Sequence, residues 1–559
     1  MTEMTSRPPL TGAMPAERMF PTLTSDQIDR IKAHGKVRPI QRGEVLIEAG
    51  QRQVPFFVVT KGEVQVLVVS EGIETLVVVH RPGQFTGEVN LLSGRPALMR
   101  ARASEPGEVI ELTREQFTAL VQAGGDLSEL IMRAFILRRV ELIAQKLGAL
   151  VLLGSEHCAS TLGVKEFLTR NSQPYNYIDL DKDNGVQEFL DHFHVSVEDI
   201  PVVICRGELV LRHPTNAQIA ECLGFNDAVD QAKVRDLVIV GAGPAGLAAA
   251  VYGASEGLDV LVVETTAPGG QTGSSSKIEN YLGFPTGITG QALAGRAYTQ
   301  AQKFGAQVVI AKSASRLVTD RKPYTLEIDS GPGVPAKTVV IATGASYQKP
   351  SLENLSRFEG TGVYYGATFM ESQLCRGEDV VVVGGGNSAG QAAVFLAETT
   401  KRVHLMVRAD KLGEKMSRYL VWRIEQTPAI EVHVQTELTA LEGENHLQRV
   451  SWRSRQDGRV ETHDIRHVFL MTGAVPGTQW LGASVALDAK GFIKTGPDLT
   501  AEDLTAARWP LARPPHLLET SLPGVFAVGD VRGGNVKRVA SAVGEGSIAV
   551  AFVHKVLSE

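Results

Sequence analysis

The 559-residue sequence has few cysteines, no strong excess of either charge and no long apolar run. Its net charge of −6 comes from dispersed residues, without the basic arm or stripe that is typical of nucleic-acid binding. No run approaches the roughly 18 apolar residues needed to cross a bilayer, and residues 1–10 lack the apolar core of a signal peptide. Its four cysteines are too few and too scattered for a disulfide framework: Cys158, Cys205, Cys222 and Cys375. We therefore expect a cytoplasmic protein with no membrane or nucleic-acid partner.

Ordinary hydrolytic and metal-dependent motifs are also missing. The thirteen histidines do not follow metal-ligand spacing, and no Gly-x-Ser-x-Gly motif occurs. We predict no metal site and expect His404, inside a strand, to be structural. The length favours about three or four domains rather than one core.

The strongest motif follows a short apolar run near the middle of the chain. Gly241, Gly243 and Gly246 form a Gly-x-Gly-x-x-Gly turn that opens an alanine-rich helix. Such glycines let the backbone approach a pyrophosphate, which binds at the positive N-terminal end of the helix. A second apolar run ends in Glu264, 18 residues after Gly246, close to the roughly 20 expected for a carboxylate that holds a ribose hydroxyl. This pattern predicts a dinucleotide site.

The same unit occurs a second time. Gly384, Gly386 and Ala389 repeat the turn after another apolar run, but the next strand ends in Arg408 instead of an acid. A carboxylate suits a free ribose 2′-hydroxyl, whereas a guanidinium suits a 2′-phosphate. We therefore predict FAD in the first unit and NADPH, rather than NADH, in the second. The alternative that Arg408 is only a solvated charge stays open.

Residues 20–147 show short strands separated by glycine-containing turns, with helical patterns at both ends, which predicts an antiparallel β barrel with helices. Within this region, residues 83–97 resemble the cyclic-nucleotide-binding domain family. The family's Gly-Glu pair, which meets the cyclic phosphate and ribose, corresponds to Gly87 and Glu88.

The same resemblance has one important departure. The family's phosphate-binding arginine, which follows a proline, is replaced by Ala97. Arg95 and Arg100 are the candidate substitutes. Two hypotheses stay open: a site for a cyclic nucleotide or another effector, and a structural or dimerising domain.

Residues 148–228 predict a compact α/β domain that resembles the thioredoxin/glutaredoxin fold. Pro201 stands where that family has a cis-proline, and the redox motif falls on Cys158 and Thr161, so its second cysteine is missing. Both a redox-active Cys158 and a degenerate scaffold remain open. Cys205 and Cys222 follow apolar patterns and are expected in the core.

From about residue 234 to the end, the chain resembles the low-molecular-weight thioredoxin reductases, whose motifs occur here in the family's order. The resemblance implies two interleaved Rossmann-like α/β domains and a homodimer. It assigns Asn387 and Ser388 to the NADPH site, beside the glycine turn. For FAD it adds these residues to the first turn and Glu264: Pro244, Ala245, Gly270, Gln271, Asn280, Thr343, Gly344, Gly529, Asp530, Arg538, Val539 and Ala540.

One departure concerns the chemistry. The family has a Cys-x-x-Cys just before its second nucleotide fingerprint, and here Gly366 and Phe369 stand at those two positions. Neither side chain can carry a thiolate, so the usual relay from flavin to dithiol is absent. Phe369 is a candidate to cover the flavin ring, and Cys375 is expected in the core. No side chain is therefore assigned as catalytic, and Cys158 remains the one candidate redox thiol.

Together these patterns predict a multidomain flavoprotein oxidoreductase. It would transfer hydride from NADPH to FAD and on to an unidentified acceptor. The alternative is a flavin- and nucleotide-binding redox sensor with little turnover. The expected division is a tail at 1–19, a cyclic-nucleotide-binding-like domain at 20–147, a thioredoxin-like domain at 148–228, an FAD domain at 234–345 and 473–559, and an NADPH domain at 346–472.

Overall fold

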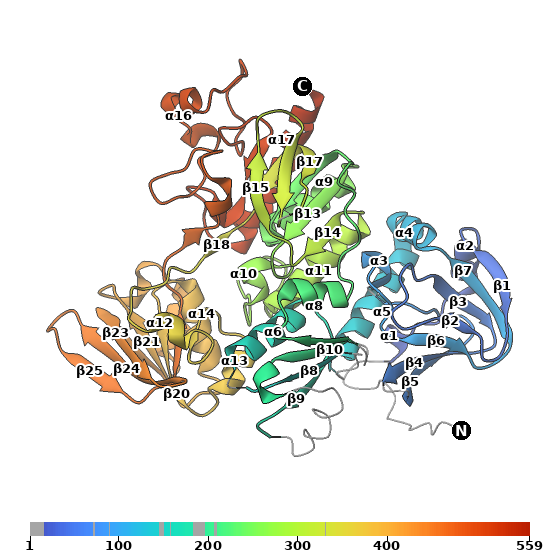
Figure 1. Cartoon of the computed structure of the whole chain (residues 1–559), viewed down its shortest axis with the longest axis horizontal. Coiled ribbons are helices and arrows are strands. Elements are labelled where there is room, and N and C mark those ends of the chain that lie inside the picture. The colour runs from blue at the N-terminus through green and yellow to red at the C-terminus, as the bar shows by residue number, and fades with distance from the viewer. Residues whose placement is uncertain are drawn as a thin grey trace. The chain divides into compact units, whose positions relative to one another are not determined.

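The structure is a computed structural model of the whole chain, and it describes residues 16–70, 73–88, 90–144, 150–156, 158–182, 196–205, 209–329 and 331–559. The chain divides into two compact units (Figure 1). Unit 1 comprises Met1–Ser155, Phe167–Asp230 and Tyr298–Lys312; unit 2 comprises Glu156–Glu166, Gln231–Ala297 and Ser313–Glu559. Most of the expected tail lies outside the described residues, but its end forms helix α1 (Ala16–Met19), in which Met19 is buried.

The N-terminal part of unit 1 combines short strands with helices. Helix α2 (Ser25–Lys32) begins at Thr24, which forms a capping box with Gln27. The other helices are α3 (Asn90–Ser93), α4 (Arg114–Gln122) and α5 (Gly125–Ala144). The strands are β1 (Lys36–Ile40), β2 (Val45–Ile47), β3 (Phe56–Lys61), β4 (Val64–Ser70), β5 (Ile73–His80), β6 (Arg100–Ala103) and β7 (Gly107–Leu112).

These strands are antiparallel as expected, but among the described residues they do not close into a barrel. They form two sheets, ordered β1-β7-β3 and β2-β6-β4-β5. Side chains rather than a continuous hydrogen-bond ladder hold the core together: Phe56 lies 4.7 Å from Phe117 and 5.6 Å from Phe85, measured between ring centroids. Strand alternation in the sequence predicts inward-facing residues, but it does not determine whether the last ladder closes.

The next part of the chain contains the sheet β11-β10-β8-β9, built from β8 (Leu150–Gly154), β9 (Asn176–Asp179), β10 (Val202–Cys205) and β11 (Leu209–Arg212). Helix α6 (Ala159–Arg170) follows Cys158, and the Ile200–Pro201 peptide is cis. Cys205 and Cys222, at the ends of β10 and α8 (Asn216–Cys222), form a disulfide across 17 residues of sequence. Cys205 is buried, as expected of a core residue, and Cys222 is partly buried. Their disulfide was not expected, because it joins two element ends that only the fold brings together.

Unit 2 contains two sheets that include parallel strands. In the first, β12 (Arg235–Val240) pairs in parallel with β13 (Val260–Glu264) and β17 (Val334–Ile341), and β28 (Val525–Ala527) pairs in parallel with β17. Strand β28 comes from the C-terminal part of the chain, so this sheet is assembled from two separate stretches. The second sheet is formed by the residues between them.

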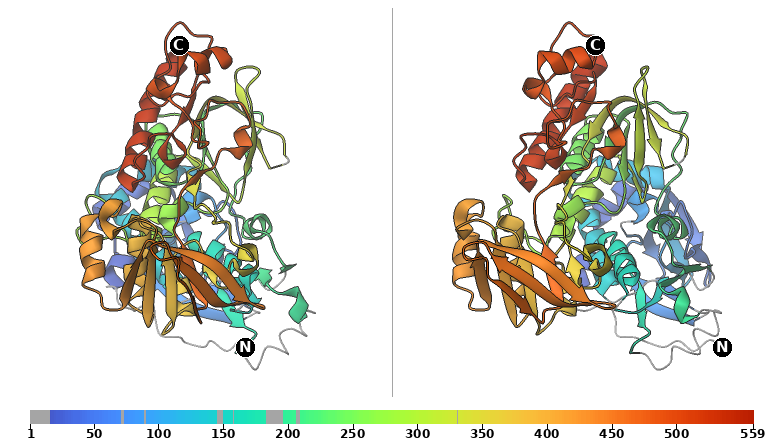
Figure 2. Two further views of the ribbon diagram at one scale, coloured as in Figure 1. Left: turned by 90° about the vertical axis from the view of Figure 1, so that its left-hand side faces the viewer. Right: turned by 60° about the vertical axis from the view of Figure 1, so that its left-hand side comes forward.

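The second sheet has the order β19-β26-β20-β21-β22 and is parallel throughout. Its strands are β19 (Val363–Tyr364), β20 (Asp379–Val383), β21 (Arg402–Val407), β22 (Ile430–Val434) and β26 (His467–Leu470). A three-stranded antiparallel sheet follows β22 in the chain: β23 (Thr436–Gly443), β24 (Leu447–Ser454) and β25 (Val460–His463). Figure 2 shows these orange strands side by side.

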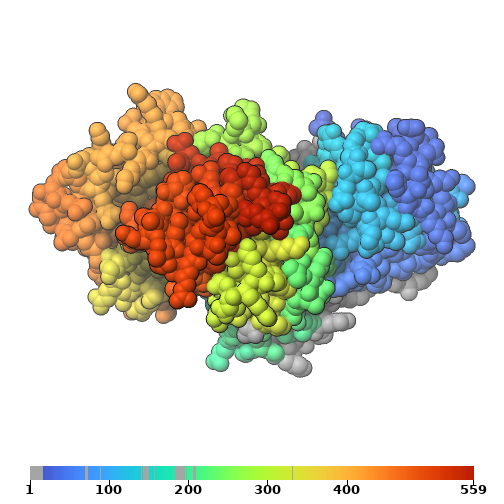
Figure 3. Space-filling view, turned by 90° about the horizontal axis from the view of Figure 1, so that it is seen from above, coloured from blue at the N-terminus to red at the C-terminus, as the bar shows by residue number. Residues whose placement is uncertain are grey.

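The C-terminal helix α17 (Val539–Ser558) differs from one expectation. By length and composition it is apolar enough to cross a membrane, although the sequence analysis found no such run. In the structure, a Cβ at Gly546 would lie 2.1 Å from the Ala245 carbonyl oxygen, so this face packs directly against helix α9 (Pro244–Ser255). Ala542, Ala549, Val550 and Val553 are buried on α17. The space-filling view shows red C-terminal residues beside yellow ones of the same unit (Figure 3).

Candidate functional site

The first glycine turn forms an open cradle at the start of α9. Gly241 has φ +103°, and a Cβ there would lie 2.4 Å from the Ala342 carbonyl oxygen. Only glycine combines this backbone conformation with so close an approach. Gly243 is the N-cap of α9, and a Cβ added there would have no neighbouring atom of the described residues within 4 Å. The N-terminal end of α9 and open space therefore meet where a pyrophosphate would bind.

Glu264 stands beside this cradle and is almost fully buried, with 7% of its surface exposed. Its carboxylate accepts hydrogen bonds from the N–H groups of Ala242 (2.7 Å), Thr266 (2.9 Å) and Ala267 (3.3 Å). The backbone thus fixes the carboxylate at the end of β13. A carboxylate has about four acceptor positions, so capacity remains for a ribose hydroxyl.

Distant segments complete the cradle. A Cβ at Gly270 would lie 3.1 Å from the Gly243 Cα, and one at Gly529 would lie 2.9 Å from the Ala245 Cβ. The fold therefore brings two further predicted FAD residues against the first turn. Burial raises the pKa of the neighbouring Asp530, opposed by Lys537.

The remaining predicted FAD residues lie in several settings. Thr343 Oγ1 donates to the Gly477 carbonyl oxygen (2.8 Å), and Gln271 Nε2 donates to that of Ala345. Arg538 is the N-cap of α17, with Val539 and Ala540 in its first turn. Asn280 is exposed. The crossover residue Gly344 has φ +66°. These positions provide backbone turns and helix ends that fit an extended dinucleotide.

The second glycine turn repeats this geometry at α14 (Asn387–Leu396). A Cβ at Gly384 would lie 2.6 Å from the Met471 carbonyl oxygen, whereas Gly386, the N-cap, again faces open space. Asn387 Oδ1 accepts from the Ser417 N–H (2.7 Å), which leaves its amide group available. Arg408 is exposed just after β21. A solvent-accessible guanidinium at this strand end fits a 2′-phosphate.

Tyr347 is a residue that the sequence analysis missed. Burial raises the pKa of its hydroxyl, a hydrogen bond with the Ser388 side chain opposes that shift, and the Asp530 charge adds to it. Tyr347 therefore interacts with Ser388, predicted for the NADPH site, and with Asp530, predicted for the FAD site. No local motif marks it, because its neighbours come from distant parts of the chain.

The positions expected for the family's cysteine pair are accessible. Phe369, the first residue of α13 (Phe369–Leu374), has 71% of its surface exposed, and nothing lies within 4 Å of the Cβ direction of Gly366. Cys375 is fully buried, and burial raises the pKa of its thiol to about 12. Cys158 is a partly exposed free thiol at the start of α6. Of the two free cysteines, only Cys158 is accessible for exchange.

In the N-terminal domain, Gly87 and Glu88 contact α5. The Arg138 guanidinium donates to the Gly87 carbonyl oxygen (2.7 Å), and Arg139 pairs with the Glu88 carboxylate (3.3 Å). A Cβ at Gly87 would lie 2.9 Å from the Cζ atom of the Phe135 ring. The predicted ribose-binding carboxylate is thus already paired with an internal guanidinium.

The two candidate substitutes for the missing phosphate arginine are also engaged. Arg95 is buried, donates to the Asn171 carbonyl oxygen (3.4 Å) and the Tyr298 hydroxyl (3.3 Å), and lies over the Phe225 ring. Arg100 pairs with Glu48 (2.9 Å) and Glu74 (2.6 Å). Ala97 packs against the domain core. A phosphate bound beside Glu88 and these two arginines would have to compete with their existing partners.

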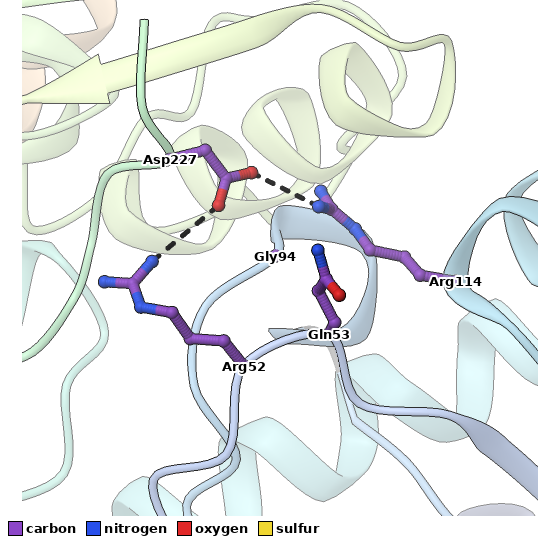
Figure 4. Close-up of a pocket in the computed structure, with 5 residues that line it drawn as sticks. All are labelled: Arg52, Gln53, Gly94, Arg114 and Asp227. Carbon is purple, nitrogen blue, oxygen red and sulfur yellow. Dashed lines mark hydrogen bonds and ion pairs between the residues drawn. The ribbon is translucent and has the colours of Figure 1, made fainter.

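A different pair of arginines borders a hollow of about 390 Å³ in unit 1. Figure 4 shows Arg52 and Arg114 converging on the carboxylate of Asp227, at 3.9 and 3.2 Å. Gln53 and Gly94 complete the lining. Gly94 has φ +72°, and a Cβ there would lie 2.6 Å from an Asp227 oxygen, so both the backbone and the close contact favour glycine.

Comparison with known proteins agrees with this geometry. Residues 235–546 match the pyridine nucleotide-disulphide oxidoreductase family, and residues 37–123 match the cyclic nucleotide-binding domain. Thioredoxin reductase from Ureaplasma parvum is 31% identical over 58% of this chain and 98% of that relative. The enzyme of the same name from Treponema pallidum is 32% identical over 56% of this chain and 94% of that relative.

A solved structure supports the same assignment. The crystal structure of T. acidophilum thioredoxin reductase aligns with a TM-score of 0.52 and 29% identity, covering 58% of this chain and 99% of that one. The matched region contains both glycine turns, each with open space before a helix. The chain therefore belongs to the pyridine nucleotide-disulphide oxidoreductase family, as a thioredoxin reductase-like, FAD- and NAD(P)H-dependent oxidoreductase fused to an N-terminal cyclic nucleotide-binding domain.

Proposed function

We propose that this oxidoreductase passes electrons from NADPH through FAD to an acceptor that it reaches without a cysteine pair. The observation that carries this proposal is that no Cys-x-x-Cys occurs in the sequence. The resemblance to the family aligns Gly366 and Phe369 with its two cysteines. When bound, FAD supplies the two-electron chemistry. The candidate acceptors are a quinone, ferredoxin, oxygen or a disulfide protein reached by another route.

The residues around the two turns have distinct duties in this proposal. Glu264 and Asp530 hold the ribose and ribityl hydroxyls of FAD, while Arg408 selects the 2′-phosphate of NADPH. A bypass through Cys158 would need a second thiol to resolve the mixed disulfide. The buried, high-pKa Cys375 is unsuited to that role.

The test compares NADPH consumption with thioredoxin and with small acceptors. The variants are Cys158→Ser, the double variant Gly366→Cys/Phe369→Cys, and a matched Gly366→Ser/Phe369→Ser control. We expect turnover with a small acceptor, none with thioredoxin, and a gain with thioredoxin only in the double cysteine variant. The open space at Gly366 and the exposure of Phe369 favour tolerance of these changes.

Two outcomes would contradict the proposal. Thioredoxin reduction by the unmodified protein that vanishes in Cys158→Ser would make Cys158 a redox arm. Stoichiometric flavin reduction by NADPH without turnover, whatever acceptor is added, would instead support the redox-sensor alternative.

We also propose that the effector of the N-terminal domain is a phosphate-bearing anion held by Arg52 and Arg114. Two convergent guanidiniums suit a phosphate, and Asp227 occupies the corresponding place as an internal carboxylate. By contrast, Glu88 and Arg100, in the region that resembles the family's nucleotide site, are already paired within the protein.

Titration with inorganic phosphate and with cyclic AMP tests this assignment. Asp227→Asn should tighten phosphate binding and Arg114→Gln should weaken it, each by about tenfold, the effect of one charge-assisted contact. Arg81→Gln, at a largely exposed arginine of the same domain, is the control. Tight cyclic AMP binding that is insensitive to both Asp227→Asn and Arg114→Gln would contradict the proposal and favour a nucleotide site at Gly87 and Glu88.

A further inference from the structure

Two neighbouring strands of the second sheet bring three metal-ligand side chains together. His404 lies in β21, and Glu431 and His433 lie in β22. The parallel register pairs His404 with Glu431 and Met406 with His433. Because side chains alternate along a strand, positions 431 and 433 face the same side as position 404. Sequence spacing concealed this group, since 26 residues separate the two strands' contributions.

The three side chains are close enough to share one ion. His404 Nδ1 lies 3.0 Å from His433 Nε2, and these atoms lie 3.8 and 3.6 Å from Glu431 oxygens. Zinc binds nitrogen and oxygen ligands at about 2.0–2.2 Å, which places two ligands of a tetrahedral site about 3.3–3.6 Å apart. Small side-chain movements would therefore bring all three groups into coordination distance.

Their chemical state also suits a metal. Burial lowers the pKa of His404 and of His433, which favours the neutral imidazole that metals require. In the contact between the two rings, one nitrogen carries the proton. A tautomeric shift would move it to the other nitrogen of the same ring and free both facing lone pairs without net proton loss.

The surroundings enclose one side of the group and leave another open. The Trp452 ring lies 5.5 Å from both histidine rings, measured between centroids, and stacks on His463 at 3.9 Å. The Glu431 side chain is 48% exposed, and Arg402 contacts one of its oxygens at 3.1 Å. The other oxygen, Oε1, faces His433. An ion could therefore enter from solvent and keep water as its fourth ligand.

We propose that His404, Glu431 and His433 form a binding site for a divalent transition-metal ion, with Zn²⁺ as the first candidate. Two imidazoles and one carboxylate are a ligand set that zinc prefers. The bound ion would join β21 to β22 within the sheet that also carries Arg408. It would thus stabilise the nucleotide-binding sheet independently of the electron acceptor.

The experiment uses the full-length protein, treated with a chelator, titrated with Zn²⁺ and analysed for bound metal and thermal stability. We compare it with His404→Asn and His433→Gln, whose amide nitrogens approximate the ligand nitrogens Nδ1 and Nε2 and preserve hydrogen bonding. His554→Gln, at a partly exposed histidine of α17 paired with Glu256, is the matched control.

We expect one Zn²⁺ per chain and a zinc-dependent rise in Tm for the unmodified protein and for His554→Gln. In both ligand variants zinc affinity should fall by more than the roughly 10–100-fold caused by losing an outer partner. If the buried His404→Asn variant does not fold, His433→Gln decides alone. Absence of zinc binding in the unmodified protein, or equal affinity in His433→Gln and the control, would overturn the proposal.

Discussion

The two glycine turns of unit 2 have the same backbone plan but differ in how tightly they are packed. In both, the first glycine lies against the carbonyl oxygen of the residue that follows a neighbouring strand, and the second glycine faces open space. A Cβ at Gly246, however, would lie 1.9 Å from the Gly241 carbonyl oxygen, whereas the equivalent Ala389 already carries a Cβ. The first turn therefore admits only glycine at its third position, and the second is wide enough for alanine.

The strand ends differ in a second way. Glu264 is buried and held by three backbone N–H groups, while Arg408 is exposed. One position is built into the turn and the other extends into solvent. Substitution at the first should therefore disturb structure and binding together, and substitution at the second should change selectivity alone.

The largest effect is expected for Gly246→Ala. The added methyl group would clash with backbone that has no flexible side chain to move, so the turn must open. We expect loss of most bound FAD and a fall of at least about 1–3 kcal/mol in the free energy of unfolding, as for overpacked cores. Flavin absorbance per chain and a denaturation curve measure both. Full flavin content and unchanged stability in this variant would contradict the inferred difference in packing between the two turns.

Glu264→Ala should have the next largest effect. It removes the acceptor of three N–H groups and the expected ribose contact. A hydrogen bond to a charged group is worth roughly 1.5–3 kcal/mol, so FAD affinity should fall about tenfold to a hundredfold. Flavin release measured by fluorescence gives the affinity. Asp530→Ala is expected to act in the same direction, and Glu264→Gln, which retains a carbonyl acceptor, should lose less. Undiminished FAD affinity in both alanine variants would contradict the assignment.

Arg408→Ala should reduce the preference for NADPH over NADH by about tenfold, the effect of one charge-assisted contact. Because Arg408 is exposed, stability should not change measurably. Rates of anaerobic flavin reduction by the two nucleotides give the preference. Arg402→Ala, at the exposed start of the same strand, is the control. The same nucleotide preference in all three proteins would show that Arg408 is only a solvated charge.

The smallest effect is expected for Ala389→Gly, the reverse of the first substitution. Glycine within helix α14 should cost about 0.5–1 kcal/mol of stability relative to alanine, and NADPH should still reduce the flavin. The measurements are Tm and the reduction rate. If Ala389→Gly instead matched the loss caused by Gly246→Ala, the two turns would be equally constrained.

Local sequence patterns were sufficient for the turns and for many elements. The strand, glycine turn and helix around Gly241 occur within a few residues, and the capping box at Thr24 needs only Gln27 to be recognised. Their geometry depends on backbone conformation and on neighbours in the chain, which the sequence displays directly. For the same reason, the apolar run that precedes Arg408 is enough to place this residue at the end of a strand.

Long-range packing decided the rest. The pairing of Glu88 with Arg139, the engagement of Arg95, the two sheets in place of a closed barrel, and the meeting of His404 with His433 all join segments far apart in the chain. A sequence states which groups are available but not which of them become neighbours. Because a buried charge or imidazole is defined by the partner it meets, its role was settled only when the chain folded.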